Sequence, residues 1–446
     1  MKSTENPQLI EGPVRKTLIH LTIPMIFGML GMVAFNLADT YFVGQLGTNE
    51  LAALSFTFPV VMLIISLSIG IGIGASAVVS KAIGRRDTSN VKRLTTDTLI
   101  LSFLLVVFFA IAGILTIDPL FGLLGAEPEI IELIHEYIFI WYLGTIFVII
   151  PMVGNSVIRA TGDTKTPSII MIFAVTVNLI LDPILIFGLG PIPMLGLKGA
   201  AIATLISRAT TFAVAAWVLF FREKMISLKL PTFSQIIQSW KSVLYIGLPT
   251  ALTRMILPLG MGVIFNLLAI YGTEAVAAFG VAARIEFFGL TVIFALATVI
   301  GPFVGQNIAA HKLNRVKTGI KHSEQFSIYW GLIMIIIFAA SANLVAPLFN
   351  DNPLVISSII QYMWIVPVGY GLYGVMQIST ASLNVLHKPF HAAALTLFQM
   401  FVLIIPLAYL GSYFFGLIGI FAAVSVSFIV SGIVSHFVLM RILKKA

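Results

Sequence analysis

Residues 51–78, LAALSFTFPVVMLIISLSIGIGIGASAV, contain no charged side chain. A helix of about 20 apolar residues crosses the hydrocarbon core of a bilayer, so this stretch is long enough to span a membrane. The whole chain has the same character: 59% of its 446 residues are hydrophobic and 10% are charged, and its mean hydropathy is +1.05. Soluble domains carry about a quarter charged residues. The composition therefore indicates an integral membrane protein and excludes a water-soluble globule.

Eleven further apolar stretches have a similar length. Only helices and closed barrels satisfy every backbone polar group in lipid, and these runs lack the alternation of barrel strands. We therefore predict an all-α membrane protein with twelve transmembrane helices. The predicted spans are residues 17–43, 51–78, 94–117, 132–153, 166–188, 198–221, 242–270, 276–304, 322–346, 354–380, 390–412 and 416–440. The first fifteen residues are polar, so we expect no cleavable signal peptide before the first span.

The basic residues divide unequally between the two sides of these spans. If both termini face the cytoplasm, all but four of the 26 Lys and Arg residues lie in inner loops and tails. The exceptions are Lys198 in an outer loop and, within spans, Arg208, Arg254 and Arg284. Basic residues in short cytoplasmic loops fix the orientation of a membrane chain. We therefore predict cytoplasmic termini in the inner membrane, and the net charge of +8 requires no nucleic-acid partner.

The two halves of the chain resemble each other. Pro24 and Pro249 are 225 residues apart, and the Gly-Thr pairs that begin at Gly47 and Gly272 have the same spacing. Six spans per copy is an even number, so both copies keep one orientation, which predicts two six-helix bundles related by a pseudo-twofold axis along the membrane normal. This plan is typical of transporters, although a duplication that only enlarges a bundle gives the same pattern. The predicted parts are an N-terminal lobe at 1–221, a cytoplasmic linker at 222–241 and a C-terminal lobe at 242–446.

Two carboxylates lie inside predicted spans of the first lobe. Asp39 belongs to the sequence FNLADT, and Asp182 belongs to NLILDP. A charged side chain at the centre of a membrane helix costs about 2.5–3.5 kcal/mol on insertion scales. Asn36 precedes Asp39 by three residues. Asn178 precedes Asp182 by four, so each carboxylate has an amide on its own helix face. The repeat offset places apolar residues at the corresponding positions of the second lobe.

These residues predict a site for a coupling cation. Burial disfavours the charged form of a carboxylate, so a desolvated pair can take up a proton near neutral pH. The oxygens of Asp39, Asp182 and Asn178, with the hydroxyl of Thr204, are also a suitable ligand set for Na⁺. The sequence does not choose between H⁺ and Na⁺, and a third interpretation gives each carboxylate only a structural role in a kinked helix. We expect no other cofactor.

Helix-breaking residues precede Asp39 in the first span. Pro24 removes a backbone hydrogen bond inside the helix, and Gly28 and Gly31 follow it. A helix with these features can kink. We predict that Pro24 is a hinge at which ionisation of Asp39 changes the bend of the first span. The alternative is a static kink.

Residues near the two carboxylates are candidates for a substrate cavity. Methionine and aromatic walls adapt to varied flat ligands. The candidates in the first lobe are Phe35, Trp141, Tyr142 and Met152, and Asn155, near the inner end of the fourth span, is a candidate for the cavity floor. For Arg284 and Glu286 we expect a structural role in a polar network between helices. Arg208 has no partner that the sequence identifies.

No motif indicates an enzyme. Gly70, Gly72 and Gly74 lie in a continuous apolar helix without the strand and acidic residue of a dinucleotide loop, so close helix packing explains them better. The chain has no phosphate-binding loop of an ATPase, no His-Glu-x-x-His sequence and no cysteine. We therefore expect no catalytic residues, no thiolate metal site and no ATPase partner.

Several short sequences resemble the multidrug and toxic compound extrusion (MATE) family. They are Ile23-Pro24, NLADT at 36–40, Val43-Gly44, Gly154-Asn155, RATGDTKTP at 159–167, and Asn178 with Leu181-Asp182-Pro183. The resemblance implies export of organic, often cationic or amphipathic compounds in exchange for inward H⁺ or Na⁺. Within the family the chain is similar to the DinF-like branch. That similarity implies that Asp39, Asn178 and Asp182 bind the coupling cation, and that Pro24 bends the first helix.

We therefore predict a secondary active multidrug antiporter that acts as a monomer in the lipid bilayer, by alternating access, on drugs or toxic organic compounds. A flippase for lipid-linked saccharide precursors is the nearest alternative, but it needs a strongly cationic cavity, and few basic residues lie in spans. A membrane enzyme would need convergent catalytic groups. A passive channel predicts conduction that does not depend on Asp39.

Overall fold

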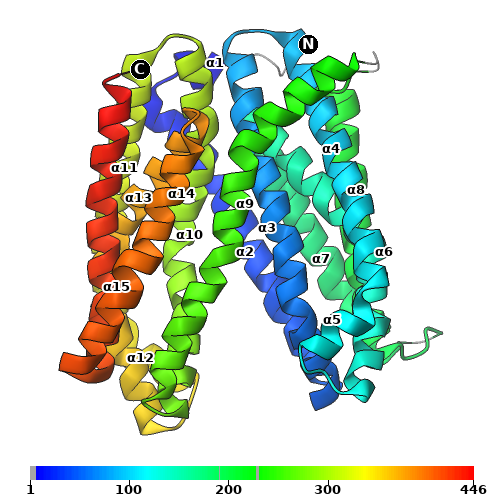
Figure 1. Ribbon diagram of the computed structural model, residues 1–446, viewed down its shortest axis with the longest axis vertical. Coiled ribbons are helices and arrows are strands. Elements are labelled where there is room, and N and C mark those ends of the chain that lie inside the picture. Colours follow the sequence, from blue (N-terminus) through cyan, green and yellow to red (C-terminus); the bar gives the residue numbers. More distant parts are fainter. Residues whose placement is uncertain (1–6, 190, 228–230, 446) are drawn as a thin grey trace. The chain divides into compact units, whose positions relative to one another are not determined.

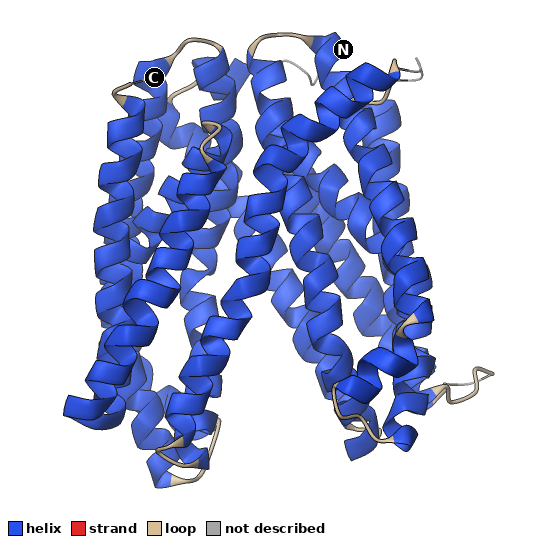
Figure 2. Cartoon of the chain, viewed as in Figure 1, coloured by secondary structure: helices blue, strands red, loops and turns tan. Residues whose placement is uncertain are grey.

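The computed structural model describes residues 7–189, 191–227 and 231–445, and all regular structure in these ranges is helical (Figures 1 and 2). The side chains at positions 7, 8, 36, 37, 48 and 51 are outside this description. In the first half the helices are α1 (Pro7–Glu11), α2 (Val14–Gly44), α3 (Thr48–Gly84), α4 (Thr88–Leu115), α5 (Ile117–Leu123), α6 (Pro128–Ala160), α7 (Lys165–Phe187), α8 (Gly196–Trp217) and the π-helical turn η1 (Val218–Arg222).

The second half repeats the pattern of long helices. It contains α9 (Phe233–Ala269), α10 (Thr273–Ala309), α11 (Leu313–Val345), η2 (Ala346–Leu348), α12 (Pro353–Ile365), η3 (Val366–Gly369), α13 (Tyr370–Val385), α14 (Pro389–Leu397), η4 (Phe398–Ile404) and α15 (Ile405–Leu443). Several helices extend past the predicted spans: α6 continues to Ala160, and α11 begins at Leu313. Hydropathy marks only the part of a helix that lies in lipid, whereas the backbone hydrogen bonds continue beyond it.

Eleven helical stretches among the described residues are long and apolar enough to cross a membrane. The longest, Pro389–Leu443, has 55 residues, which is about 80 Å at 1.5 Å per residue and far exceeds one bilayer core. At Gly416 its backbone leaves the helical conformation, with φ 65° and ψ −143°, and the orange and red parts of α15 run in opposite directions (Figure 1). A Cβ on Gly411 or Gly419 would overlap the backbone of the other. The stretch therefore supplies two spans, which gives the predicted twelve.

The described chain divides into two compact units. Of the described residues, those between Ile23 and Ala251 form unit 1, and residues 7–22 with 252–445 form unit 2. The boundaries of these units differ from those of the predicted lobes in two places. The described part of the segment predicted as a linker, with the first part of α9, belongs to unit 1, and the start of α2 belongs to unit 2.

Hydrogen bonds explain why the predicted linker, residues 222–241, belongs to unit 1. The indole Nε1 of Trp240 donates to the carbonyl oxygen of Asp97 at 2.8 Å. The backbone N–H of Ser227 donates to the hydroxyl of Thr96 at 2.8 Å. Both acceptors lie on α4. The segment before α9 is therefore attached to unit 1 and is not a free connection.

The first helix is attached to unit 2. Leu9 is 1% exposed, and its carbonyl oxygen accepts hydrogen bonds from Asn307 Nδ2 at 2.9 Å and from Arg315 Nη2 at 3.1 Å. Lys312 Nζ donates to the carbonyl of Ile10 at 3.2 Å. The chain then passes from unit 2 to unit 1 within α2, between Thr22 and Ile23. The proline predicted as a hinge follows this point directly.

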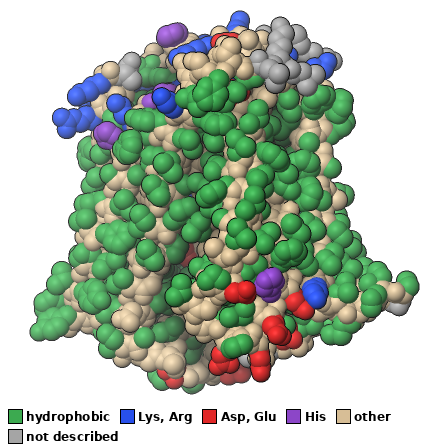
Figure 3. All heavy atoms as spheres, turned by 45° about the vertical axis from the view of Figure 1, so that its right-hand side comes forward, with side chains coloured by type: hydrophobic (Ala, Val, Ile, Leu, Met, Phe, Trp, Pro, Cys, Tyr) green, Lys and Arg blue, Asp and Glu red, His purple; other side chains and the backbone are tan. Residues whose placement is uncertain are grey.

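Charged side chains gather at the ends of the helices. On the face drawn in Figure 3, acidic side chains lie at one end and basic ones at the other. The acidic end includes the start of α6, which carries Glu129, Glu132 and Glu136. Lys198, the basic residue predicted to be outside, forms an ion pair with Glu136 at 2.8 Å. This separation of charge supports the predicted orientation.

Single cysteines can test the orientation, because the chain contains none of its own. Glu129→Cys, at the acidic end, should react with a membrane-impermeant maleimide added to intact cells. Lys317→Cys, at the basic end of α11, should react only after the cells are opened. Labelling in the opposite order would show that the termini face outward.

Candidate functional site

Helices α7 and α8 pack in an antiparallel register that two contacts fix. The hydroxyl of Ser207 donates to the carbonyl oxygen of Ala174 at 2.6 Å. Eight residues before Ser207, a Cβ on Gly199 would overlap the carbonyl group of Leu185. Thr204 lies between these two contacts on α8. The register therefore places Thr204 at the level of Asn178 on α7.

Helix α2 lies beside α7 in a parallel register. A Cβ on Gly28 would come within 3.1 Å of Ser168 Cα, and one on Gly31 within 3.7 Å of Ile172 Cγ1. Gly28 lets the two backbones approach closely, as small residues do in membrane helix contacts. The same offset between the helices places Asp39 between the levels of Asn178 and Asp182.

The two carboxylates predicted from the sequence belong to one polar cluster. The carboxylates of Asp39 and Asp182 are close enough to interact electrostatically. Each also interacts electrostatically with the Tyr137 hydroxyl. Asn178 and Asp182 are 0% exposed, and Asn178 Nδ2 donates to Asp182 Oδ1 at 3.0 Å. We call Asp39, Tyr137, Asn178, Asp182 and Thr204 the carboxylate cluster. Its members come from α2, α6, α7 and α8.

Four oxygens of the carboxylate cluster are buried without a hydrogen-bond partner in the described part of the chain. They are Asp39 Oδ1, Asn178 Oδ1, Asp182 Oδ2 and Thr204 Oγ1. A buried polar atom without a partner costs about 1–3 kcal/mol, and more when it is charged. A cation removes this cost, either as a proton on a carboxylate or as Na⁺ held by several oxygens. The described residues include no group of three His, Cys, Asp or Glu side chains that could hold a metal ion.

A half-buried cation lies beside the carboxylate cluster. Arg208 follows Thr204 by four residues, on the same face of α8, and its guanidinium carbon is 4.7 Å from the centre of the Phe35 ring. Arg208 is within electrostatic reach of Asp39 and Tyr137. Nevertheless it forms no ion pair or hydrogen bond with any residue that the structure describes. The arrangement can therefore present both a positive and a negative group to a ligand.

The predicted aromatic residues of α6 have different environments. Trp141 follows Tyr137 by four residues and shares its helix face. Tyr142 is buried, and a Cβ on Gly113 of α4 would overlap its ring. The ring of Tyr142 therefore fills a contact between α4 and α6, and its role in a substrate cavity stays a prediction.

Two other predicted cavity residues lie far along α6. Asn155 is eighteen residues after Tyr137, about 27 Å at 1.5 Å per residue, and its buried Oδ1 has no partner among the described residues. Met152 lies one turn away, where its carbonyl accepts from Ser156. These residues cannot contact a small ligand held at Asp39. The side chain of Asn36, also predicted for the site, lies outside the described residues.

The sequence analysis missed Tyr137. A tyrosine within a span is usual, and hydropathy does not distinguish a hydroxyl near carboxylates from one at the membrane surface. The available signal was its spacing of four residues from Trp141, which the sequence did predict near the site. Only the structure shows which turn of α6 lies beside Asp39.

The half-buried carboxylate of Glu286 in unit 2 is in a different environment. Tyr362 and Tyr370 donate hydrogen bonds to Glu286 Oε2, at 2.6 and 3.3 Å. Both tyrosines belong to the hydrophobic core of unit 2 and pack edge-on against phenylalanine rings, Phe279 for Tyr362 and Phe338 for Tyr370. This contact is the polar network between helices that the sequence predicted for Glu286.

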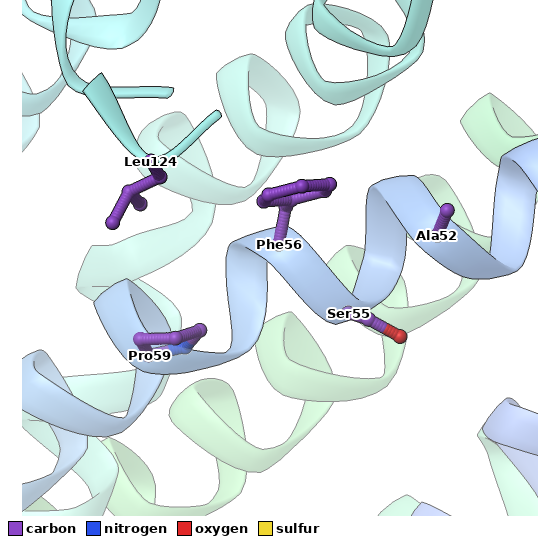
Figure 4. Close-up of a pocket in the computed structure, with 5 residues that line it drawn as sticks. All are labelled: Ala52, Ser55, Phe56, Pro59 and Leu124. Atoms are coloured by element: carbon purple, nitrogen blue, oxygen red, sulfur yellow. The ribbon is translucent and has the colours of Figure 1, made fainter. Parts of the chain in front are cut away.

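An open hollow of about 410 Å³ lies on α3 of unit 1. Its lining is Ala52, Ser55, Phe56, Pro59 and Leu124. Figure 4 shows the ring of Phe56 rising from α3 toward the chain at Leu124. The lining has no charged side chain and no member of the carboxylate cluster, so it offers no group for a coupling cation.

Comparison with known proteins decides the family. The MatE family model matches residues 24–184 and 249–410. The chain belongs to the MATE family. The two matched blocks begin 225 residues apart, which is the offset of the internal repeat. Members of this family are secondary transporters, so the protein is an ion-coupled membrane transporter and not an enzyme.

Relatives and solved structures extend over the whole chain. The protein is 37% identical to an FAD transporter of Shewanella oneidensis, over 97% of this chain and 96% of the relative. It is 26% identical to the multidrug export protein MepA of Staphylococcus aureus, over 94% and 92%. The structure of a multidrug resistance MATE family transporter in an outward-facing conformation has a TM-score of 0.93 at 30% identity and covers 100% of both chains. The Vibrio cholerae MATE transporter VcmN in the bent form has a TM-score of 0.92 at 31% identity and covers 97% of each.

The unpaired hydroxyl of Thr204 predicts opposite effects on stability and transport. Thr204→Val keeps the shape and removes a buried unsatisfied group, so thermal unfolding should show a stability gain of about 1 kcal/mol. Cation-coupled transport in proteoliposomes should fall several-fold. Thr211→Val is the matched control, because that hydroxyl donates to the carbonyl of Ser207 within α8. A Thr204→Val protein with lower stability and normal transport would contradict the assignment.

Proposed function

We propose that this transporter exports organic compounds in exchange for a cation that binds at Asp39 and Asp182. The observation that supports the proposal is the set of buried oxygens without partners in the carboxylate cluster. A membrane protein has no water within the bilayer to satisfy such groups. H⁺ is the coupling ion proposed first and Na⁺ is the alternative, because the same oxygens can serve both.

The proposed coupling acts through α2. A cation can drive transport only if it binds one conformation more tightly than the other. Asp39 lies on the half of α2 that belongs to unit 1, and the helix enters that unit next to Pro24. Proline leaves one helix hydrogen bond unmade, so bending at this point is less costly than elsewhere in α2. We propose that cation binding at Asp39 changes this bend.

The similarity to the DinF-like branch supports coupling in the first half of the chain. It rests on Pro24, Asp39, Asn178 and Asp182. The satisfied hydrogen bonds of Glu286 in unit 2 support the same choice. A membrane potential would add about 2.3 kcal/mol per 100 mV for each charge that moves inward. The proposed setting is the inner membrane, with cytoplasmic termini and a monomeric chain.

Two substrate classes have support from different observations. Amphipathic aromatic drugs fit the rings of Phe35 and Trp141 beside an acidic cluster, and a 26% identical relative is a multidrug export protein. Export of FAD is the second candidate, because a 37% identical relative is an FAD transporter and Arg208 supplies a positive charge. The flippase alternative has less support, since acidic groups outnumber basic ones at this site.

Inside-out vesicles can test the coupling. Vesicles that have accumulated H⁺ or Na⁺ should release it when ethidium or FAD is added, each in a separate experiment. Asp39→Asn should abolish the release, because the amide can no longer bind and release the cation, while the protein still inserts. Glu286→Gln is the matched control in unit 2 and should keep exchange close to that of the unmodified protein, because the amide oxygen can still accept from Tyr362 and Tyr370. An unchanged rate in Asp39→Asn would exclude the proposed role.

A further inference from the structure

The cation–π pair of Arg208 and Phe35 has free bonding capacity. A guanidinium carries five N–H donors in its plane. Its carbon lies over the Phe35 ring, 4.7 Å from the ring centre, and the ring has no oxygen or nitrogen to accept from these donors. No acceptor for them is found within the described ranges. An unpaired arginine in a membrane span is costly, so a role that pairs it with a ligand is favoured.

A structural ion pair does not explain Arg208. Asp39 is within electrostatic reach of Arg208, and it is the nearest candidate for such a partner on α2. The two side chains do not bond to each other, and Asp39 Oδ1 is buried without any partner in the described chain. Two opposite charges that only stabilised the fold would be expected to meet. Their separation suits groups that bind different ligands.

We propose that Arg208 and Phe35 form an anion subsite for compounds in which a phosphate or similar anionic group lies next to a planar ring. The proposal rests on the proposed export function and names a substrate class for it. The planar fork of arginine matches the oxygens of a phosphate in a bidentate contact. The ring of Phe35, and that of Trp141 on the face of α6 that carries Tyr137, offer apolar surface for a flat ligand.

The positions of Phe35 and Asp39 connect this subsite to the coupling cation. Phe35 precedes Asp39 by four residues, so both lie on one face of α2. An ionised Asp39 repels an anionic ligand at Arg208, and a cation at Asp39 removes that repulsion. Charge alone therefore favours joint binding of the anion and the cation. Exchange of the two requires a movement of α2 that carries Phe35 away from Arg208.

Flavin mononucleotide and riboflavin provide a matched pair of probes, because they share a ring and differ by one phosphate. The full chain in phosphatidylcholine nanodiscs should bind the mononucleotide about tenfold more tightly than riboflavin. Arg208→Gln should remove this preference, because it should weaken the binding of the mononucleotide far more than that of riboflavin. Arg208→Lys keeps the charge without the planar fork and should keep part of the preference. Arg254→Gln, an intramembrane arginine of unit 2, is the control and should keep all of it.

A second variant, Phe35→Leu, tests the proposal even if Arg208→Gln does not fold. This substitution keeps an apolar side chain and removes the ring. It should therefore weaken the binding of both flavins several-fold without changing the ratio of their affinities. Equal binding of the two flavins to the unmodified protein, or a preference that persists in Arg208→Gln, would overturn the proposal. Loss of mononucleotide binding in phosphatidylglycerol nanodiscs would also overturn it, in favour of a lipid phosphate at Arg208.

Failure of the subsite and failure of the export function give different results. Ethidium-driven release of H⁺ or Na⁺ without any phosphate preference would remove the subsite and keep the antiporter. A phosphate preference that depends on Arg208, in a protein that exchanges no cation, would keep the subsite and remove the antiporter.

Discussion

The absence of water inside a bilayer is the constraint on which this structure depends. Every backbone group in the hydrocarbon core must be bonded within the protein, so all regular structure in the described chain is helical. The same constraint makes each unpaired side-chain oxygen in a span costly. Most embedded hydroxyls meet it locally: Thr98, for example, donates to the carbonyl of Leu94 on its own helix. Other buried polar atoms also lack partners in the described chain, Asp97 Oδ1 and Oδ2 among them, but the carboxylate cluster gathers four unpaired oxygens from three helices. That concentration is the reason for placing the cation there.

Small residues bring the cluster together. Gly28 lets α2 approach α7 at Ser168, and Ser207 bonds α8 to the same helix at Ala174. These contacts set the levels of three helices, and they place Asp39, Asn178 and Thr204 side by side. The functional groups depend on this register, since a shift of one helical turn moves a side chain by about 5.4 Å. Packing between helices therefore determines the geometry of the site.

The fold was largely readable from the sequence, because twelve apolar stretches and a repeat offset are one-dimensional patterns. The two carboxylates were readable for a similar reason, since charge is rare in spans. The depth and direction of neutral side chains were not readable. The packing of Tyr142 on Gly113 and the position of Tyr137 near the carboxylates both depend on contacts between helices. The attachment of the first helix to unit 2 depends on the carbonyl of Leu9, which no side-chain pattern reveals.

The central claim is that Asp39 and Asp182 take up and release the coupling cation. Infrared difference spectroscopy of the purified protein can test it directly, because a protonated carboxyl has its own C=O stretching band. The account predicts that this band disappears when the pH is raised or Na⁺ is added. It also predicts that the change is lost in the Asp39→Asn and Asp182→Asn double variant. A double variant with the same band change as the unmodified protein would contradict the account, because another carboxyl would then carry the proton.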